Sequence, residues 1–203
     1  MGERGAISEA NVGLSARLVL VLGGARSGKS DYAQRLAGRL SPQVLYVATA
    51  AAGDEEMAER IARHRAARPA TWDTVEAPRD VFPAVYQALN GHGAVLLDCL
   101  TMLASNLLLA NEGDPAAAEA RLLADLDALS DLCAARRATL VIVSNEVGMG
   151  VVPAYPLGRA YRDLLGRANQ HLARRADRVL LLVAGIPVDI KALSRQLPDP
   201  YGE

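Results

Sequence analysis

The sequence predicts an α/β protein with a doubly wound, mostly parallel sheet folded as a single domain. Short, fully apolar runs alternate along the chain with longer amphipathic stretches, which is the rhythm of strands and helices in βαβ units. Hydrophobic residues make up 51% of the chain but aromatic residues only 4%, so the core must be aliphatic, as in parallel sheets covered by helices on both faces. With about 150 residues per domain as a guide, a length of 203 residues favours one domain.

Two strand and helix units open the chain. Residues 18–22, LVLVL, are apolar on both faces and end at two glycines, and residues 29–40 carry apolar side chains at helical spacing. Residues 44–48, VLYVA, predict a second strand. Asp54 then begins a helix whose acidic first turn suits the helix dipole, and Pro69 ends that region.

The later elements continue this alternation. Strands are expected at residues 71–76, 94–98, 140–144, 179–184 and 188–191, with helices in most of the gaps, including one from 115 to about 137. We expect residues 17–191 to form the domain, residues 1–16 an N-terminal extension and residues 192–203 a C-terminal tail. In such a sheet, ligands bind at the carboxyl ends of the strands.

Composition and charge exclude several classes of protein. The formal net charge is -1, which does not favour a nucleic-acid binder driven by charge. The longest apolar runs, of about five or six residues, are far too short for a membrane span. Cys99 and Cys133 are too few for a disulfide framework and match no metal-binding spacing, and residues 1–16 lack the apolar block of a secretion signal. We therefore expect a cytoplasmic protein without a membrane span.

A phosphate-binding motif lies between the first strand and the first helix. Residues 23–30, GGARSGKS, match G-x-x-x-x-G-K-S/T at every fixed position. The glycines let backbone N–H groups converge on phosphate oxygens, Lys29 supplies a point charge to the β and γ groups, and Ser30 offers a hydroxyl to Mg²⁺. The alternative is a plain glycine turn before a helix. The motif and its context favour the P-loop nucleoside triphosphate hydrolase type of fold.

Asp98 is the candidate second ligand of the metal. It ends the expected strand 94–98 with an acid at the phosphate side of the sheet, where nucleotide chemistry requires one. The alternative is that Asp98 caps the helix that begins near Thr101, and both roles are compatible. The chain has no Asn/Thr-Lys-x-Asp element for reading guanine, which disfavours a switch-type GTPase.

One of the three histidines has an unusual position. His64 extends an apolar stripe with Met57 and Ile61 and is surrounded in sequence by arginines. A cationic neighbourhood disfavours imidazolium and keeps a ring nitrogen available for nucleophilic attack on phosphorus. The spacing alone favours the alternative interpretation, in which His64 lies on a solvated helix face or interacts with the dipole at the helix C-terminus. His92 is expected in a loop and His171 on a helix surface.

The segment 144–153, SNEVGMGVVP, leaves the carboxyl end of an expected buried strand and then turns through two glycines. Loops of this kind often line a ligand crevice. In the alternative interpretation, Asn145 and Glu146 satisfy backbone groups of a turn.

Taken together, these segments resemble the family of bifunctional adenosylcobinamide kinases and adenosylcobinamide-phosphate guanylyltransferases. The resemblance rests on GGARSGKS, VLYVATA, DEEMAERIARHRAARP, VLLDCLT, VSNEVGMGVVP and GRAYRDLLGRANQHLA, in this order, between about residues 17 and 191. It implies an enzyme of cobalamin biosynthesis that phosphorylates adenosylcobinamide with ATP or GTP. The same enzyme then transfers GMP from GTP to that phosphate, giving adenosyl-GDP-cobinamide and pyrophosphate.

The resemblance also implies a set of site residues. GMP would be carried on the histidine that matches His64. Members of the family form homo-oligomers, typically trimers, and use Mg²⁺. The nucleotide contacts carry over to Gly23, Gly24, Ala25, Arg26, Ser27, Gly28, Lys29 and Ser30, to Thr49, Ala50 and Ala51, to Arg65, Ala66, Ala67 and Arg68, and to Glu76 and Asp98, with Ser30 and Asp98 as metal ligands.

The chain departs from the family pattern at two places. Asp98 stands where the family often has Glu, and its side chain, one methylene shorter, leaves room for a water molecule between the carboxylate and the metal. The segment Ala154-Tyr155-Pro156 replaces the usual polar residues after the NEVGMG loop, which bears on how the acceptor fits. Two other functions remain open at this point: a single-activity small-molecule kinase with a structural His64, and a nucleotide-binding switch without a metabolite substrate.

Overall fold

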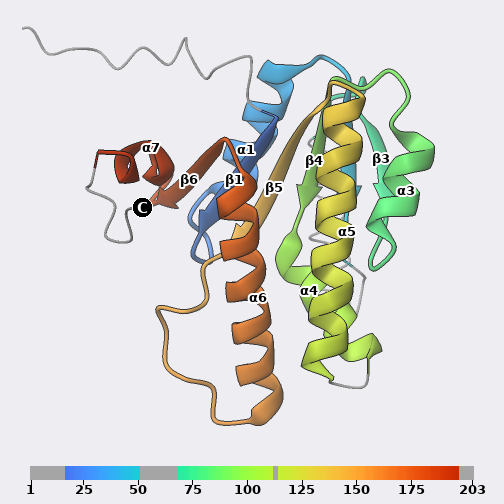
Figure 1. Cartoon of the computed structure of the whole chain (residues 1–203). Coiled ribbons are helices and arrows are strands. Elements are labelled where there is room, and N and C mark those ends of the chain that lie inside the picture. The colour runs from blue at the N-terminus through green and yellow to red at the C-terminus, as the bar shows by residue number, and fades with distance from the viewer. Residues whose placement is uncertain (1–16, 51–67, 112–113, 197–203) are drawn as a thin grey trace, which may run out of the picture.

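The computed structural model describes residues 17–50, 68–111 and 114–196, which form one seven-stranded sheet with helices on both faces (Figure 1). The strands are β1 (Leu18–Gly23), β2 (Val44–Ala48), β3 (Asp73–Glu76), β4 (Ala94–Asp98), β5 (Thr139–Asn145), β6 (Arg178–Val183) and β7 (Ile186–Asp189). The helices are α1 (Lys29–Leu40), α3 (Val81–Ala88), α4 (Leu100–Ala110), α5 (Pro115–Ala135), α6 (Pro156–Arg175) and α7 (Ile190–Ser194).

The sheet is parallel except at one edge, so the predicted fold class is confirmed. Its strand order is β3-β2-β4-β5-β1-β6-β7, and only β7 runs antiparallel to its neighbour β6. From β1 the chain crosses to β2 and the edge strand β3, returns through β4 to β5 beside β1, and then passes to β6 on the other side of β1. The connections that leave β1 and β5 therefore run in opposite directions across the sheet, which places a topological switch point between these two strands. The carboxyl ends of β1, β2, β4 and β5 therefore meet along one edge of the sheet.

Each face of the sheet has its own apolar core. Alternate residues of β1 point to opposite faces: Leu20 packs with α4, α5 and α6, whereas Val21 packs with α1. All strand residues of β1, β2 and the first four of β4 are buried, as expected for strands covered on both sides. The near absence of aromatic residues gives a core dominated by Leu, Val and Ala.

The C-terminal hairpin differs from the sequence expectation. The strand expected at residues 188–191 is β7, Ile186–Asp189, and α7 begins at Ile190, across the expected domain boundary at residue 191. The two-residue turn at Ala184 and Gly185 has a positive φ at both residues, as tight hairpins require. Because alanine is an unusual first residue in such a turn, the sequence pattern did not reveal the hairpin.

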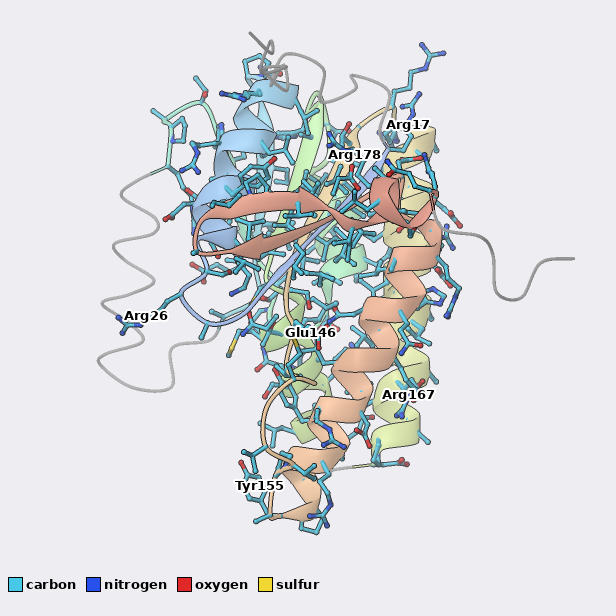
Figure 2. All side chains as sticks on the ribbon, turned by 90° about the vertical axis from the view of Figure 1, so that its left-hand side faces the viewer. Arg17, Arg26, Glu146, Tyr155, Arg167 and Arg178 are labelled. Carbon is cyan, nitrogen blue, oxygen red and sulfur yellow. The ribbon has the colours of Figure 1, made fainter. Side chains whose placement is uncertain are left out.

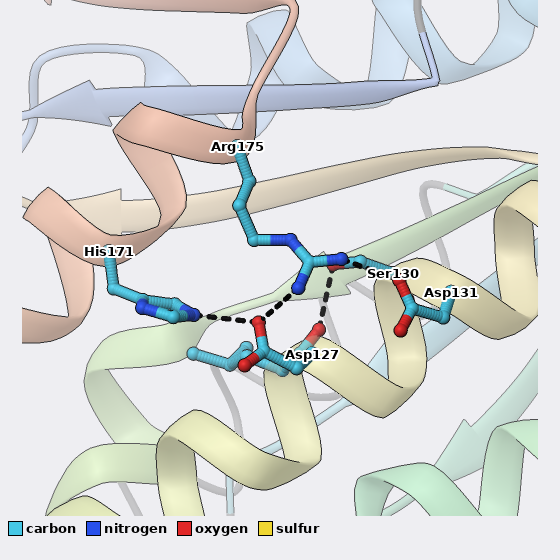
Figure 3. Close-up of polar contacts among 6 residues, drawn as sticks. Asp127, Ser130, Asp131, His171 and Arg175 are labelled. Atoms are coloured by element: carbon cyan, nitrogen blue, oxygen red, sulfur yellow. Dashed lines mark hydrogen bonds and ion pairs between the residues drawn. The ribbon is translucent and has the colours of Figure 1, made fainter.

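Helices α5 and α6 are joined by a cluster of charged side chains (Figure 3). Asp127 Oδ1 accepts hydrogen bonds from His171 Nε2 at 2.7 Å and from Arg175 Nη1 at 2.6 Å, and Arg175 also reaches Asp131. The expectation that His171 is an ordinary surface group is therefore wrong, since its side chain is mostly buried in this cluster.

His92 lies in the turn before β4, as expected, but its imidazole is nearly buried. Its Nε2 atom lies 2.9 Å from a carboxylate oxygen of Asp73 on β3. This contact connects the turn to the edge strand of the sheet. Among the described residues, no helix is long and apolar enough to cross a membrane.

Two neighbouring leucines of α4 test the packing of the core. Leu107 is fully buried, whereas Leu109 is 61% exposed. Leu107→Ala should lower the free energy of unfolding by about 2–5 kcal/mol, because it removes buried methyl groups and leaves a cavity. Leu109→Ala should change it by less than about 0.5 kcal/mol. Urea unfolding of both variants measures the difference, and equal effects would contradict the placement of α4.

Candidate functional site

The phosphate loop occupies the turn between the end of β1 at Gly23 and the start of α1 at Lys29. Gly28, at the N-terminal cap of α1, has a φ of 84° and offers no side-chain cap to the helix. Backbone N–H groups at the start of α1 are therefore not taken by a capping side chain. A helix start of this kind binds anions through these groups and through the helix dipole.

Gly23 is required by the packing of the loop. A Cβ at this position would lie 2.4 Å from Ser27 Oγ and 2.8 Å from the carbonyl oxygen of Leu182. The neighbouring Gly24, in contrast, has nothing within 4 Å of the corresponding position. The loop is also held by the β6–β7 turn, because Gly185 donates its backbone N–H to the Ser27 carbonyl at 2.9 Å.

The side chains of the loop are directed differently. Lys29 reaches back across the loop, and its ammonium group donates to the Gly24 carbonyl at 3.1 Å. Arg26 projects outward, away from the body of the molecule (Figure 2). The hydroxyl of Ser27 is buried without a hydrogen-bond partner among the described residues, which is the state expected of a donor whose acceptor is a ligand.

Asp98 lies next to this loop at the end of β4. One of its carboxylate oxygens, Oδ1, accepts a hydrogen bond from Ser30 Oγ at 3.3 Å, and the other, Oδ2, accepts one from the Tyr46 phenol at 2.9 Å. The alternative role of helix cap is wrong, because α4 begins at Leu100 with Cys99 at its cap position. A hydroxyl and a carboxylate this close are oxygen ligands of the kind that Mg²⁺ shares with nucleotide phosphates.

Tyr46 and Arg68 complete a row of polar contacts that starts at the phosphate loop. The Arg68 guanidinium stacks over the Tyr46 ring at 3.5 Å and donates to the Thr74 hydroxyl at 3.1 Å. Burial raises the pKa of Tyr46 far above its usual value, and the neighbouring Asp98 carboxylate raises it further. The phenol is therefore protonated and acts as a hydrogen-bond donor.

Thr49 is held by backbone contacts at the same edge. Its hydroxyl donates to the Cys99 carbonyl at 2.7 Å and accepts from the Cys99 N–H at 2.8 Å, and its own carbonyl accepts from Asn106. The side chain of Thr49 thus joins β2 to the start of α4 and is fully buried. Ala50 follows it and is partly exposed.

Glu76 ends β3 with its side chain exposed, in register with Ala48 of β2. The structure thus brings the phosphate loop, Thr49, Ala50, Arg68, Glu76 and Asp98 to one edge of the sheet. Other sequence-predicted site residues, Ala51, His64, Arg65, Ala66 and Ala67, lie outside the described residues.

The segment after β5 is attached directly to the phosphate loop. The Glu146 N–H donates to the Gly23 carbonyl at 3.2 Å, and the Glu146 carboxylate accepts from the Gly148 N–H at 2.9 Å, as the turn interpretation predicted. Beyond this turn, apolar side chains face solvent, with Met149 83% and Val151 97% exposed. The segment runs down to Tyr155, near the start of α6 (Figure 2).

A surface cavity of about 460 Å³ lies on the α6 side of the same edge. Its lining combines apolar residues such as Leu22 and Val179 with polar ones such as Glu146, Asn169 and Gln170. Asn169 also orders the end of β5, because its amide accepts from Ser144 Oγ and donates to the Asn145 carbonyl.

Sequence reasoning missed three contributors to this site. The sequence pattern predicts Tyr46 only as part of a strand, although a single tyrosine in an otherwise aliphatic, buried strand is a signal that its hydroxyl has a polar partner. Asn106 and Asn169 lie within helices that pack behind the edge, and their backbone contacts depend on tertiary structure that no local pattern reveals.

The sequence of the chain is similar to a family of known proteins. The family model described as cobinamide kinase / cobinamide phosphate guanyltransferase matches residues 19–190. The bifunctional adenosylcobalamin biosynthesis protein CobU of Salmonella typhimurium is 46% identical over 181 residues, covering 86% of this chain and 99% of that protein. The corresponding protein CobP of Pseudomonas aeruginosa is 44% identical over 172 residues, covering 85% and 96%.

Among solved structures, the P4 protein of bacteriophage phi6 in complex with ADP aligns with a TM-score of 0.46 at 16% identity, covering 85% of this chain and 52% of that one. This similarity is too remote to assign a family. The two sequence matches assign one, since both relatives are matched along nearly their whole length. The chain therefore belongs to the cobinamide kinase / cobinamide phosphate guanyltransferase family.

Proposed function

We propose that this chain carries out both reactions for which its family is named, acting on adenosylcobinamide and using ATP or GTP. The observation that carries the proposal is the phosphate loop with Ser30 hydrogen-bonded to Asp98, in a chain matched by the family model over residues 19–190. The first reaction transfers the γ-phosphoryl group to the aminopropanol hydroxyl of the acceptor. The second transfers GMP to the phosphate that the first has installed.

In the first reaction the protein mainly positions the phosphates of the nucleotide and neutralises their charge. The backbone of residues 23–30 binds the phosphates, and Lys29 places a cation beside the β and γ groups. Ser30 and Asp98 would hold Mg²⁺, which neutralises developing charge on the phosphates when it is bound. The acceptor hydroxyl then attacks the γ-phosphorus, and the bond between this phosphorus and the β–γ bridging oxygen breaks. ADP or GDP leaves, and the hydroxyl proton is released to solvent.

In the second reaction we assign the nucleophile to His64, as the resemblance to the family implies. A neutral imidazole nitrogen attacks the α-phosphorus of GTP, the α–β bond breaks, and pyrophosphate leaves. An oxygen of the acceptor phosphate then attacks the resulting phosphoramidate, the P–N bond breaks, and His64 is regenerated. Arg65 and Arg68, close to His64 in sequence, are suited to stabilise the charge that develops on the phosphates.

The acceptor is bulky and amphipathic, and we expect it to dock on an open surface. The apolar segment 147–152 is the best candidate, because it is exposed and its first turn is hydrogen-bonded to Gly23 of the phosphate loop. Because the segment starts beside the phosphate loop, we expect an acceptor that lies on it to place its reactive hydroxyl near the nucleotide. Tyr155 lies at the far end of the same segment (Figure 2).

The proposal also covers the oligomeric state of the protein and its location in the cell. By resemblance to the family we expect a homo-oligomer, typically a trimer. Cys99 and Cys133, the two cysteines of the chain, are both free, which is compatible with the reducing cytoplasm where we place the enzyme.

Two neighbouring glycines test nucleotide binding by the loop. Gly23→Ala should weaken ATP affinity roughly tenfold or more, at least about 1.4 kcal/mol, because its methyl group forces Ser27 and the Leu182 carbonyl apart. Gly24→Ala, which has open space around the added methyl group, should change the affinity much less. Titration calorimetry of both variants provides the comparison, and similar losses would show that the close packing at Gly23 is irrelevant.

His64 is tested with GTP labelled at the α-phosphate. The wild-type protein should retain acid-labile label, whereas His64→Ala should retain none and should lose about 10³-fold or more of its GMP transfer rate. Its phosphorylation of adenosylcobinamide should continue. His171→Ala is the matched control, since His171 contacts Asp127 between two helices, and it should remain labelled. Label on the His64→Ala protein would exclude His64 as the carrier.

Val151→Ser tests the docking of the acceptor. Burying a valine side chain is worth about 1.5 kcal/mol, so the KM for adenosylcobinamide should rise roughly tenfold while the KM for ATP stays constant. Tyr86→Ser, at a 56% exposed position on α3, is the control and should change neither value. An unchanged KM for adenosylcobinamide in Val151→Ser would place the acceptor elsewhere.

A further inference from the structure

Tyr46 is an unusual residue for its position in the sheet. It lies in the middle of β2, is 3% exposed, and packs among the aliphatic side chains that face α1. Its phenol oxygen, however, is 2.9 Å from Asp98 Oδ2. A phenylalanine would fill the same apolar space, so the hydroxyl is explained by its contact with the carboxylate.

Among the described residues, the two oxygens of the Asp98 carboxylate accept hydrogen bonds from different side chains. Oδ2 accepts from Tyr46, and Oδ1 accepts from Ser30 of the phosphate loop. The last side-chain torsion of aspartate has broad, shallow preferences, so hydrogen bonds to both oxygens restrict the rotation of the carboxylate more than a hydrogen bond to one oxygen does. A second hydrogen bond, from a rigid ring on the neighbouring strand, fixes its plane.

The ring of Tyr46 is itself held in place. Register pairing puts Tyr46 beside Leu96 of β4, two residues before Asp98, and the Arg68 guanidinium covers the ring at 3.5 Å. Arg68 is in turn hydrogen-bonded to Thr74 on β3. Strands β2 and β3 therefore both contribute to the orientation of a carboxylate on β4.

We infer that Tyr46 is a positioning residue for phosphoryl transfer: its phenol holds one oxygen of Asp98, so that the other oxygen stays directed at Ser30 and the phosphate loop. Arg68 supports this arrangement by holding the ring. The inference rests on the proposed role of Asp98 as a metal ligand. It adds Tyr46, a buried residue of β2 whose phenol contacts Asp98, to the groups on which the reaction depends.

Tyr46→Phe removes the hydroxyl and keeps the ring under Arg68. The affinity for a non-hydrolysable ATP analogue is measured twice, once with Mg²⁺ and once with EDTA. The ratio of these two affinities is the metal-dependent gain. In Tyr46→Phe this gain should fall about tenfold, which is the typical loss when a partner of a metal ligand is removed, and affinity in EDTA should be unchanged. The kcat for adenosylcobinamide phosphorylation should also fall, with KM for the acceptor constant.

A matched control separates positioning from stability. Tyr161→Phe removes another largely buried phenol, which donates to the Thr101 carbonyl at 3.5 Å, and should leave the metal-dependent gain as in the wild type. If Tyr46→Phe lowers the melting temperature but keeps the full gain, Tyr46 is merely structural and the inference fails.

Two further variants test the role of Asp98 and replace Tyr46→Phe if that variant does not fold. Asp98→Asn should abolish the gain in affinity that Mg²⁺ provides. If the gain persists in Asp98→Asn, the proposed role of Asp98 as a metal ligand is wrong. If the gain is lost in Asp98→Asn but kept in Tyr46→Phe, only the role of Tyr46 is rejected. Should Tyr46→Phe not fold, Arg68→Met replaces it, because Arg68 is partly exposed and its removal loosens the ring. A twofold to threefold smaller gain is then expected, and an undiminished gain overturns the inference.

Discussion

The register of the central parallel strands is the constraint on which the site depends. Pairing of β1 with β5 and of β4 with both β5 and β2 brings the ends of these strands to one edge. Gly23 and Asp98 end β1 and β4 there, and Ser30 in the first turn of α1 reaches the Asp98 carboxylate. A shift of β4 by one residue would turn Asp98 to the other face, so aliphatic packing in two cores maintains the polar contacts of the site.

Much of this arrangement follows from the sequence. The phosphate loop was predictable because its glycines, Lys29 and Ser30 have fixed spacing between an apolar run and an amphipathic helix. Asp98 was predictable because it ends a buried strand, and helix 29–40 agrees with α1 in both bounds. In these places local pattern and tertiary packing require the same structure.

Other features could not be predicted, since they arise from contacts between residues distant in sequence. Tyr46 and Asp98 are 52 positions apart, and no local pattern indicates that their side chains meet. The Ala184–Gly185 turn has a positive φ at both residues, which its sequence does not predict because alanine rarely adopts this conformation. The pairing of His171 with Asp127 depends on how α5 and α6 pack, so a surface position was the natural but incorrect expectation.

Both proposed reactions depend most directly on where the triphosphate lies. A crystal structure of the protein with Mg²⁺ and a non-hydrolysable GTP analogue measures this. We expect the phosphates on the backbone of residues 23–30 and the metal between the nucleotide and the oxygens of Ser30 and Asp98. Phosphates bound away from this loop, or a metal without contact, direct or through water, to either residue, would contradict this expectation.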